Sequence, residues 1–225
     1  MLPRIIMHNA VTVDGRLDWF SADVAKYYEL AAFWKEDATL AGTDTILQAY
    51  PEENLIPDDD EAFEHRRVDA EDTRALLVIP DSKGRLRHIL HMLWHEPYWR
   101  DIVILISDST SQSYLTYLEK RNINYIRAGK DHVDYKKALE ELNSSYGVKV
   151  VRVDSGGILN GVLLKEGLVD EVSILIHPYL IGGTSPRSIY NAADLVAAAG
   201  IVNLKLIHLE QLANDLIWIR YEIKK

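Results

Sequence analysis

Cysteine is absent from this chain of 225 residues, and so is any long hydrophobic run. Without cysteine the protein has no disulfide framework, no thiolate metal site and no cysteine nucleophile. No segment approaches the ~18 uncharged apolar residues of a membrane span, and the short apolar run after Pro3-Arg4 is not that of a signal peptide. We therefore expect a cytoplasmic protein with no membrane partner.

Basic residues are in the minority. Lys and Arg total 25 against 34 Asp and Glu, which gives a formal net charge of −9. Proteins that bind nucleic-acid backbones without sequence preference usually carry a basic surface. The composition therefore argues against nucleic acid as a partner and leaves small anionic ligands open.

Two sequence signatures are also missing. The chain has no G-x-G-x-x-G fingerprint, which argues against an ordinary Rossmann dinucleotide site. The zinc deaminase signature, H-x-E with P-C-x-x-C, cannot be formed without cysteine. Any nucleotide site in this chain is then built in another way.

The apolar residues that are present follow an α/β rhythm. With 48% hydrophobic and 26% charged residues, the chain can form one sizeable core. Short apolar runs predict buried strands at residues 5–11, 38–41, 75–79, 102–106, 148–153 and 172–176. Helical spacing predicts helices at residues 21–36, 111–120, 134–146 and 158–167. Parallel strands joined by crossover helices follow from this order.

The rhythm changes near the C-terminus. Two strand-like runs, 202–209 and 216–223, are separated by a short polar segment, which predicts an antiparallel hairpin. No linker rich in Pro, Gly or Ser divides the chain, so residues 1–225 are expected to form a single domain. The acidic stretch 52–72 has few core residues and is expected to be an exposed loop or a short surface helix.

Residues 151–160 form the strongest local motif, in which an apolar strand ends in Asp154-Ser155-Gly156-Gly157 and passes directly into an amphipathic helix. Glycines let the backbone approach a ligand, and the N–H groups at a helix start attract phosphate. The pattern indicates an anion site, although a tight turn without a ligand has the same pattern. A second junction of this kind begins at Gly42, where plain helix capping is the alternative, and Asp14-Gly15 by itself indicates only a turn.

In order along the chain, these segments resemble the pyrimidine reductases of riboflavin biosynthesis. The resemblance covers residues 9–16, 42–45 and 154–157, and it continues through Gly-Leu-Val-Asp-Glu at 167–171 and Pro-Tyr-Leu-Ile-Gly-Gly at 178–183. It implies an α/β, dihydrofolate-reductase-like fold with a mostly parallel central sheet, flanking helices and a C-terminal antiparallel hairpin. It also implies NADPH as cofactor, a small heterocyclic substrate, a stand-alone reductase and a homodimer.

The resemblance assigns the cofactor-binding residues. It implies that one side of the cofactor cleft is lined by Gly42 and Thr45, and that Ala10 borders the nicotinamide. The diphosphate would be held by Ser155, Gly156, Gly157, Ile158 and Leu159. Ser82 and Arg85 are candidates for the 2′-phosphate of NADPH, because a cation with a hydroxyl at a strand end suits a phosphate. A solvated turn is the alternative there.

The resemblance also assigns the substrate site, to Asn9, Asp14 and Asp154. NADPH would reduce C1′ of a ring-opened ribosylaminopyrimidine 5′-phosphate to the ribityl product, with Asp154 the first candidate for carrying the proton and water the second. Two alternatives stay open: a reductase of the same fold that acts on a pterin or folate, and a non-catalytic NADPH-binding module. In each case a side chain at Gly157 is expected to obstruct the diphosphate.

The sequence departs from the family pattern after the Gly42 junction. The family's paired aspartates before proline, and the Leu-Thr and basic residue that follow, are replaced by Tyr-Pro-Glu-Glu-Asn at 50–54. Glutamates repel a phosphate, so either the substrate has no phosphate or the grip comes from elsewhere, with Arg66, Arg67 and Arg187 as candidates. Asp154 also replaces a family glutamate, which keeps the charge but shortens the reach.

Residues 87–99 are rich in histidine and aromatic side chains. His91 and His95 would share one helical face with His88 one turn earlier, as metal ligands can. The order is not H-E-x-x-H and no third ligand can be named, so we expect no metal. We expect instead a packing or dimer surface, with Trp94 and Trp99 exposed.

Overall fold

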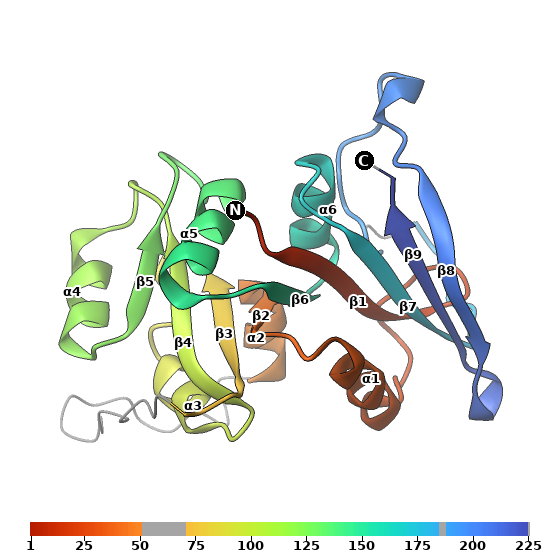
Figure 1. Ribbon diagram of the computed structural model, residues 1–225, viewed down its shortest axis with the longest axis horizontal. Helices are drawn as coiled ribbons and strands as arrows, with labels where there is room; N and C mark the ends of the chain where they lie inside the picture. The colour runs from red at the N-terminus through yellow and green to blue at the C-terminus, as the bar shows by residue number, and fades with distance from the viewer. Residues whose placement is uncertain (51–70, 185–187, 225) are drawn as a thin grey trace. The chain divides into compact units, whose positions relative to one another are not determined.

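The computed structural model describes residues 1–50, 71–184 and 188–224 (Figure 1). They fall into two compact units, the first made of Met1–Pro3 and Glu36–Lys149 and the second of Arg4–Lys35 and Val150–Lys225. Both units combine segments that are distant in the sequence, so no single linker separates them. The expectation of a single domain stays a prediction.

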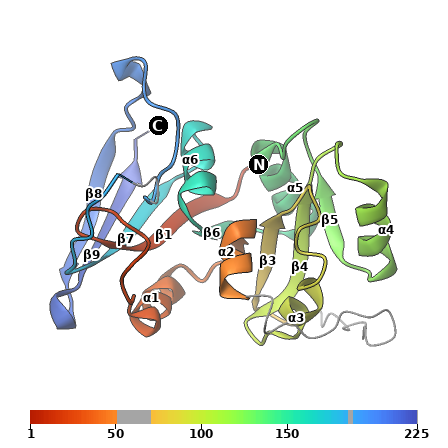
Figure 2. The same ribbon diagram turned by 180° about the vertical axis from the view of Figure 1, so that it is seen from behind.

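The described strands of the first unit are parallel and lie in the order β5-β4-β3-β2. The strands are β2 (Ala38–Ala41), β3 (Ala75–Pro80), β4 (Trp99–Ile106) and β5 (Asn124–Arg127). The helices are α2 (Thr43–Ala49), α3 (Leu90–His95), α4 (Gln112–Lys120) and α5 (Tyr135–Tyr146). In Figure 1 α5 lies in front of these strands, and in Figure 2, seen from behind, α2 lies in front of them.

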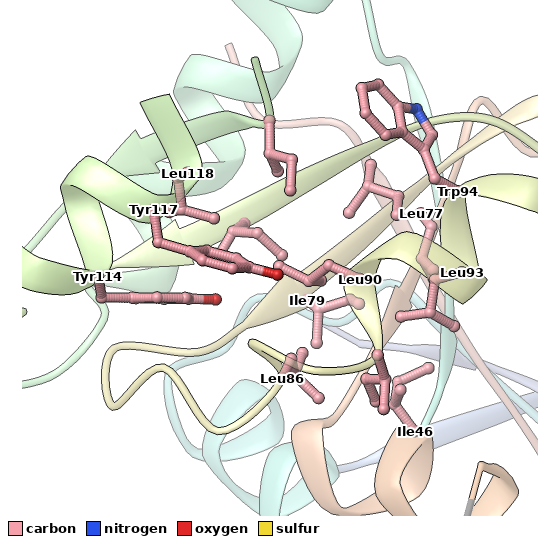
Figure 3. Close-up of a cluster of buried hydrophobic side chains, with 14 of the residues drawn as sticks. Ile46, Leu77, Ile79, Leu86, Leu90, Leu93, Trp94, Tyr114, Tyr117 and Leu118 are labelled. Atoms are coloured by element: carbon pink, nitrogen blue, oxygen red, sulfur yellow. The ribbon is translucent and has the colours of Figure 1, made fainter. Parts of the chain in front are cut away.

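Side chains of β3 and β4 point alternately to the two faces of the sheet, and a core of the first unit forms on one of these faces. Leu77 and Ile79 point to the face covered by α2, α3 and α4, where they meet Leu90, Trp94 and other buried residues (Figure 3). Helix α4 begins where the Ser111 side chain accepts a hydrogen bond from the N–H of Tyr114, and α5 ends at Gly147, whose φ of 69° suits glycine. The parallel strands are thus buried by helices, as parallel sheets require.

The second unit places its strands in the order β6-β1-β7-β9-β8. Strands β1 (Arg4–Thr12), β6 (Val150–Asp154) and β7 (Glu171–His177) are parallel, whereas β8 (Leu204–Gln211) and β9 (Ile217–Ile223) form an antiparallel hairpin beside β7. The unit also contains α1 (Val24–Ala31) and α6 (Gly157–Lys165), together with three short 3₁₀ segments, η1 (Ala32–Trp34), η3 (Ala198–Gly200) and η4 (Ala213–Asp215).

Strand β1 is buried on both faces of this unit. Ile6 points toward α1, where Tyr27, Trp34 and Trp218 complete a cluster of buried apolar residues. Asn9, with the opposite parity along the strand, is hydrogen-bonded to Asn160 of α6. One helix therefore lies on each face of β1.

The sequence-based elements are largely confirmed, as are the mostly parallel strand arrangement and the C-terminal hairpin. Strand β5 was not expected. The exposure predicted for the tryptophans was wrong, because Trp94 is only 4% exposed and Trp99 packs against the same core from a half-buried position. Among the described residues, no helix combines the length and the hydropathy needed to cross a membrane.

Candidate functional site

The first turn of α6 in the second unit is open to a ligand. Gly156 is the N-cap residue, its cap carries no side-chain hydrogen bond, and the first turn has no acidic residue. A Cβ built at Gly156 would meet nothing within 4 Å, and Ile158 next to it is 63% exposed. The backbone N–H groups of this turn are therefore free of a competing side-chain acceptor.

Gly157 serves a different purpose from Gly156. A Cβ at Gly157 would overlap the carbonyl oxygen of Ser188, and one at Gly161 would overlap that of Asn191. The N–H of Asn191 also donates to the Gly157 carbonyl oxygen at 2.9 Å. The segment that contains Ser188 and Asn191 thus occupies this face of α6. A side chain at Gly157 would displace that segment, so its effect would not report on a diphosphate alone.

A network of amides holds the turn that precedes α6. Asn9 Nδ2 donates to the carbonyl oxygen of Ser155 at 2.8 Å, and Asn160 Nδ2 lies 3.0 Å from Asn9 Oδ1. Asn160 is fully buried, and its Oδ1 has no hydrogen-bond partner among the described residues. Asn9 is therefore placed to orient the turn, and its contact with a substrate stays a prediction.

Asp154 ends β6 beside α1. Arg152 Nη1 donates to Asp154 Oδ2 at 3.0 Å, and the Tyr28 hydroxyl donates to the same oxygen at 3.3 Å. The side chain of Arg152 is 5% exposed and that of Asp154 is 25% exposed. The Tyr27 hydroxyl also interacts with the Asp154 carboxylate, so this acid is surrounded by one cation and two phenols.

A buried histidine lies on the same face of the second unit. His8 Nδ1 is 2.9 Å from Ser173 Oγ, its Nε2 is 3.1 Å from the Tyr27 carbonyl oxygen, and its ring stacks on Tyr27. Burial lowers the pKa of His8 to about 4. The imidazole is thus neutral at physiological pH, and its remaining ring N–H is hydrogen-bonded inside the protein.

Asp14 connects two loops of the second unit. Thr12 Oγ1 donates to Asp14 Oδ1 at 2.5 Å, and the N–H of Gly182 donates to Oδ2 at 2.6 Å. These hydrogen bonds, the one from Thr12 first, lower the pKa of Asp14 to about 2. The carboxylate therefore fixes the loop after β1 to the Ile181-Gly182 backbone, and its expected contact with substrate stays a prediction.

In the first unit, hydrogen bonds to a buried carboxylate hold the turn after β3. The buried Asp81 carboxylate accepts from the N–H groups of Arg85 and Leu86 at 2.9 Å each, and from the Tyr114 hydroxyl at 2.9 Å. Gly84, with φ of 68°, lies against the Tyr114 ring, where a Cβ would be 2.9 Å from a ring atom. The turn is thus fixed before any ligand arrives.

Two of the predicted cofactor residues lie in this turn. Ser82 Oγ is buried without a hydrogen-bond partner among the described residues. Arg85 Nη1 is 2.7 Å from Asp44 Oδ1, in the first turn of α2, so the start of this helix and the 82–85 turn are brought together. Gly42 is buried as the N-cap residue of α2, and Thr45 is half-buried.

Sequence reasoning missed three residues of these sites. Arg152 had a signal, because residues two apart on a strand share a face and Arg152 therefore accompanies Asp154. Tyr28 and Asp44 had no such signal, since their partners are far away in the sequence. His91 and His95 contact each other, with ring centroids 4.6 Å apart, and no group of three suitable side chains that could hold a metal occurs in the described residues. Arg66, Arg67, Arg187 and most of the acidic stretch 52–72 lie outside the described residues.

The chain matches a known protein family. The sequence profile of the RibD C-terminal domain matches residues 3–218. The chain belongs to this family. A relative from Methanothermobacter thermautotrophicus, named 2,5-diamino-6-ribosylamino-4(3H)-pyrimidinone 5′-phosphate reductase, is 28% identical over 100% of both chains. A protein of the same name from Aquifex aeolicus is 28% identical over 92% of this chain and 88% of its own.

Solved structures share the fold of this RibD C-terminal domain. A pyrimidine reductase-like protein from Corynebacterium diphtheriae gives a TM-score of 0.69 at 15% identity, covering 99% of this chain and 92% of its own. Acinetobacter baumannii RibD gives 0.67 at 19% identity over 99% of this chain. This chain spans 58% of that RibD chain. At these identities the likeness establishes the fold alone.

Proposed function

We propose that the protein is an NADPH-dependent reductase of riboflavin biosynthesis, which converts the ribosyl group of a ribosylaminopyrimidine 5′-phosphate to ribityl. The observation that carries the proposal is the end-to-end match with a relative named as such a reductase. The match is supported by a family profile that covers residues 3–218. The open α6 turn and the Asp154 cluster give the chain side chains and backbone groups suited to this chemistry.

The described residues fit a nicotinamide dinucleotide phosphate. In the second unit, the uncapped first turn of α6 and the open Gly156 suit a diphosphate, with Ser155, Gly157, Ile158 and Leu159 beside it. In the first unit, the buried Ser82 Oγ lacks a partner that a phosphate oxygen would supply, and Arg85 carries the matching charge. Ala10, Gly42 and Thr45 are proposed to line the cofactor by backbone and methyl contacts.

The cofactor, when bound, supplies the hydride that reduces C1′ of the ring-opened sugar. Asp154 is proposed to accept a hydrogen bond from the substrate, because its side chain is 25% exposed while Arg152 and Tyr28 hold it in place. Its negative charge would favour the protonated form of the C1′=N bond that ring opening leaves, and this form accepts a hydride at C1′ more readily than the neutral one. Arg152 and Tyr28 are positioning residues in this scheme, and the proton consumed in the reduction reaches the substrate by way of Asp154 or water.

Turnover of the natural substrate tests the proposed function. The purified protein is mixed with NADPH and freshly prepared ribosylaminopyrimidine 5′-phosphate, in the diaminopyrimidinone and in the deaminated uracil form, and absorbance at the nicotinamide band is followed. We expect consumption of NADPH with at least one form, and a ribityl product by mass spectrometry. NADPH binding without turnover on either form would contradict the proposed substrate.

A second copy of this chain is the proposed partner of the C-terminal hairpin. Strand β8 lies at the end of its strand order, and Leu204, Leu206, Ile207 and Leu209 are each between 41% and 62% exposed. We call these four residues the β8 apolar surface. Because an unprotected apolar edge strand pairs readily with another chain, a homodimer is proposed to cover this surface.

A further inference from the structure

We infer that Asp44 is a specificity-determining residue of the proposed cofactor site. By pairing with Arg85, Asp44 competes with the 2′-phosphate and lowers the preference of the protein for NADPH over NADH. The inference rests on the proposed function, because it requires that Ser82 and Arg85 receive the 2′-phosphate.

The Asp44–Arg85 pair joins two anchored segments of the first unit. Thr43, beside Asp44, donates a hydrogen bond from Oγ1 to the Pro80 carbonyl oxygen, which ties the start of α2 to the end of β3. Asp81 holds the other segment through the N–H of Arg85 at 2.9 Å. With both backbones fixed, the 2.7 Å contact between Arg85 Nη1 and Asp44 Oδ1 depends only on side-chain rotamers.

The unpartnered hydroxyl of Ser82 points independently to a ligand in this turn. Buried hydroxyl groups almost always have a hydrogen-bond partner, and leaving one without a partner is costly. Ser82 Oγ is buried and has none among the described residues. A phosphate oxygen of a ligand paired with Arg85 would supply the missing partner.

Charge and exposure explain why Asp44 would affect one cofactor more than the other. The side chain of Arg85 is 47% exposed and that of Asp44 is 60% exposed, so their ion pair is weak and a ligand phosphate can displace it. After displacement, the Asp44 carboxylate remains near a group of the same charge and repels it. The 2′-hydroxyl of NADH carries no charge and can donate a hydrogen bond to a carboxylate. Asp44 therefore disfavours the phosphate and tolerates the hydroxyl.

The test uses calorimetry to measure how the protein binds two ligands, one that represents the adenosine half of NADPH and one that represents the adenosine half of NADH. Adenosine 2′,5′-bisphosphate and adenosine 5′-monophosphate are titrated into wild type, Asp44→Asn and a control, Glu140→Gln. Glu140 is exposed on α5 in the same unit, so the control removes one negative charge elsewhere. We expect Asp44→Asn to bind the bisphosphate about three- to tenfold more tightly, since an exposed pair and a screened repulsion are both of modest strength. Binding of the monophosphate should be unchanged or weaker, and Glu140→Gln should behave as wild type.

Three outcomes separate this inference from the proposed function. If Asp44→Asn changes the affinity for neither ligand, or raises the affinity for both equally, Asp44 does not determine specificity. The gain in bisphosphate affinity from Asp44→Asn should be smaller when Arg85 is also replaced, by Arg85→Gln. If the gain is just as large without Arg85, Asp44 does not act by competing with the phosphate for Arg85. A wild type that binds neither the bisphosphate nor NADPH would instead overturn the proposed cofactor. Asp44→Ser repeats the test if thermal unfolding shows that the asparagine variant is damaged.

Discussion

Asp154 carries the negative charge of its cluster, whereas Tyr28 contributes one weak hydrogen bond to it, and this difference predicts how variants of the two residues behave. Asp154→Asn keeps the size of the side chain but removes the charge, so we expect kcat to fall by about 10²-fold or more with little change in NADPH affinity. Tyr28→Phe removes only the 3.3 Å hydrogen bond and should lower kcat by a few-fold, about the value of one weak hydrogen bond. Steady-state kinetics with NADPH titrations separate the two effects. Equal losses in both variants would show that Tyr28 takes a direct part in the reaction.

His8 makes the stability of the protein depend on pH. Burial holds its pKa at about 4 in the folded chain, against the ordinary value of 6.5 for the unfolded chain. Because the unfolded chain binds this proton at the higher pH, the contribution of His8 is complete above about pH 6.5 and is lost as the pH falls toward 4. The loss over that window is at most about 3 kcal/mol of unfolding free energy. An NMR titration should show no protonation of the His8 ring above about pH 5, with the resonance assigned from His8→Asn.

At the residue scale, the sequence identified positions but not their contacts. The motif at 151–160 marked Asp154, and the two-residue period of a strand pairs it with Arg152. The third member, Tyr28, comes from a helix that is more than a hundred positions away, and its contact depends on how α1 packs on β1 and β7. The Asp44–Arg85 pair also depends on the packing of two separate elements, and no local pattern contains it.

The glycines of α6 divide into two groups, and the division predicts opposite effects on stability. Gly156→Ser places a hydroxyl at the open N-cap, where it can accept a hydrogen bond from the first turn and stabilise the helix by a few tenths of a kcal/mol, about the preference of Ser over Gly at this position. The same hydroxyl competes with a bound diphosphate, so NADPH should bind about tenfold more weakly, roughly the value of one hydrogen bond to a charged group. Thermal unfolding and NADPH titration measure the two effects.

Gly161→Ala is the matched control for that experiment. Its methyl group would overlap the Asn191 carbonyl oxygen and should cost about 1–3 kcal/mol, as overpacking usually does. If Gly156→Ser instead destabilised the protein or left NADPH binding unchanged, the first turn of α6 would not be the diphosphate site.

At the element scale, periodicity was reliable where strands were buried and failed where they were not. Strands β1, β3 and β4 have long buried runs, and each was expected within a few residues of its observed bounds. In β5 only Ile126 of four residues is buried, so its sequence carries no apolar pattern. Trp94 was expected on the surface because the sequence of a short helix does not show which side faces the sheet, yet it packs in the core of the first unit.

At the scale of the whole molecule, the β8 apolar surface predicts self-association. We expect the purified protein to sediment as a dimer, because four exposed aliphatic side chains on an edge strand are costly to leave in water. Leu206→Glu places a charge in the middle of that surface and should shift the protein to monomers, with thermal stability largely retained because Leu206 is 50% exposed.

Tyr98→Glu is the control, since Tyr98 is 67% exposed in the first unit, outside the β8 apolar surface. Sedimentation velocity over a range of concentrations distinguishes the three proteins. A dimer that survives Leu206→Glu but dissociates with Tyr98→Glu would place the interface on the first unit. A wild type that stays monomeric at every concentration would mean that the exposed edge of β8 meets a different partner or none.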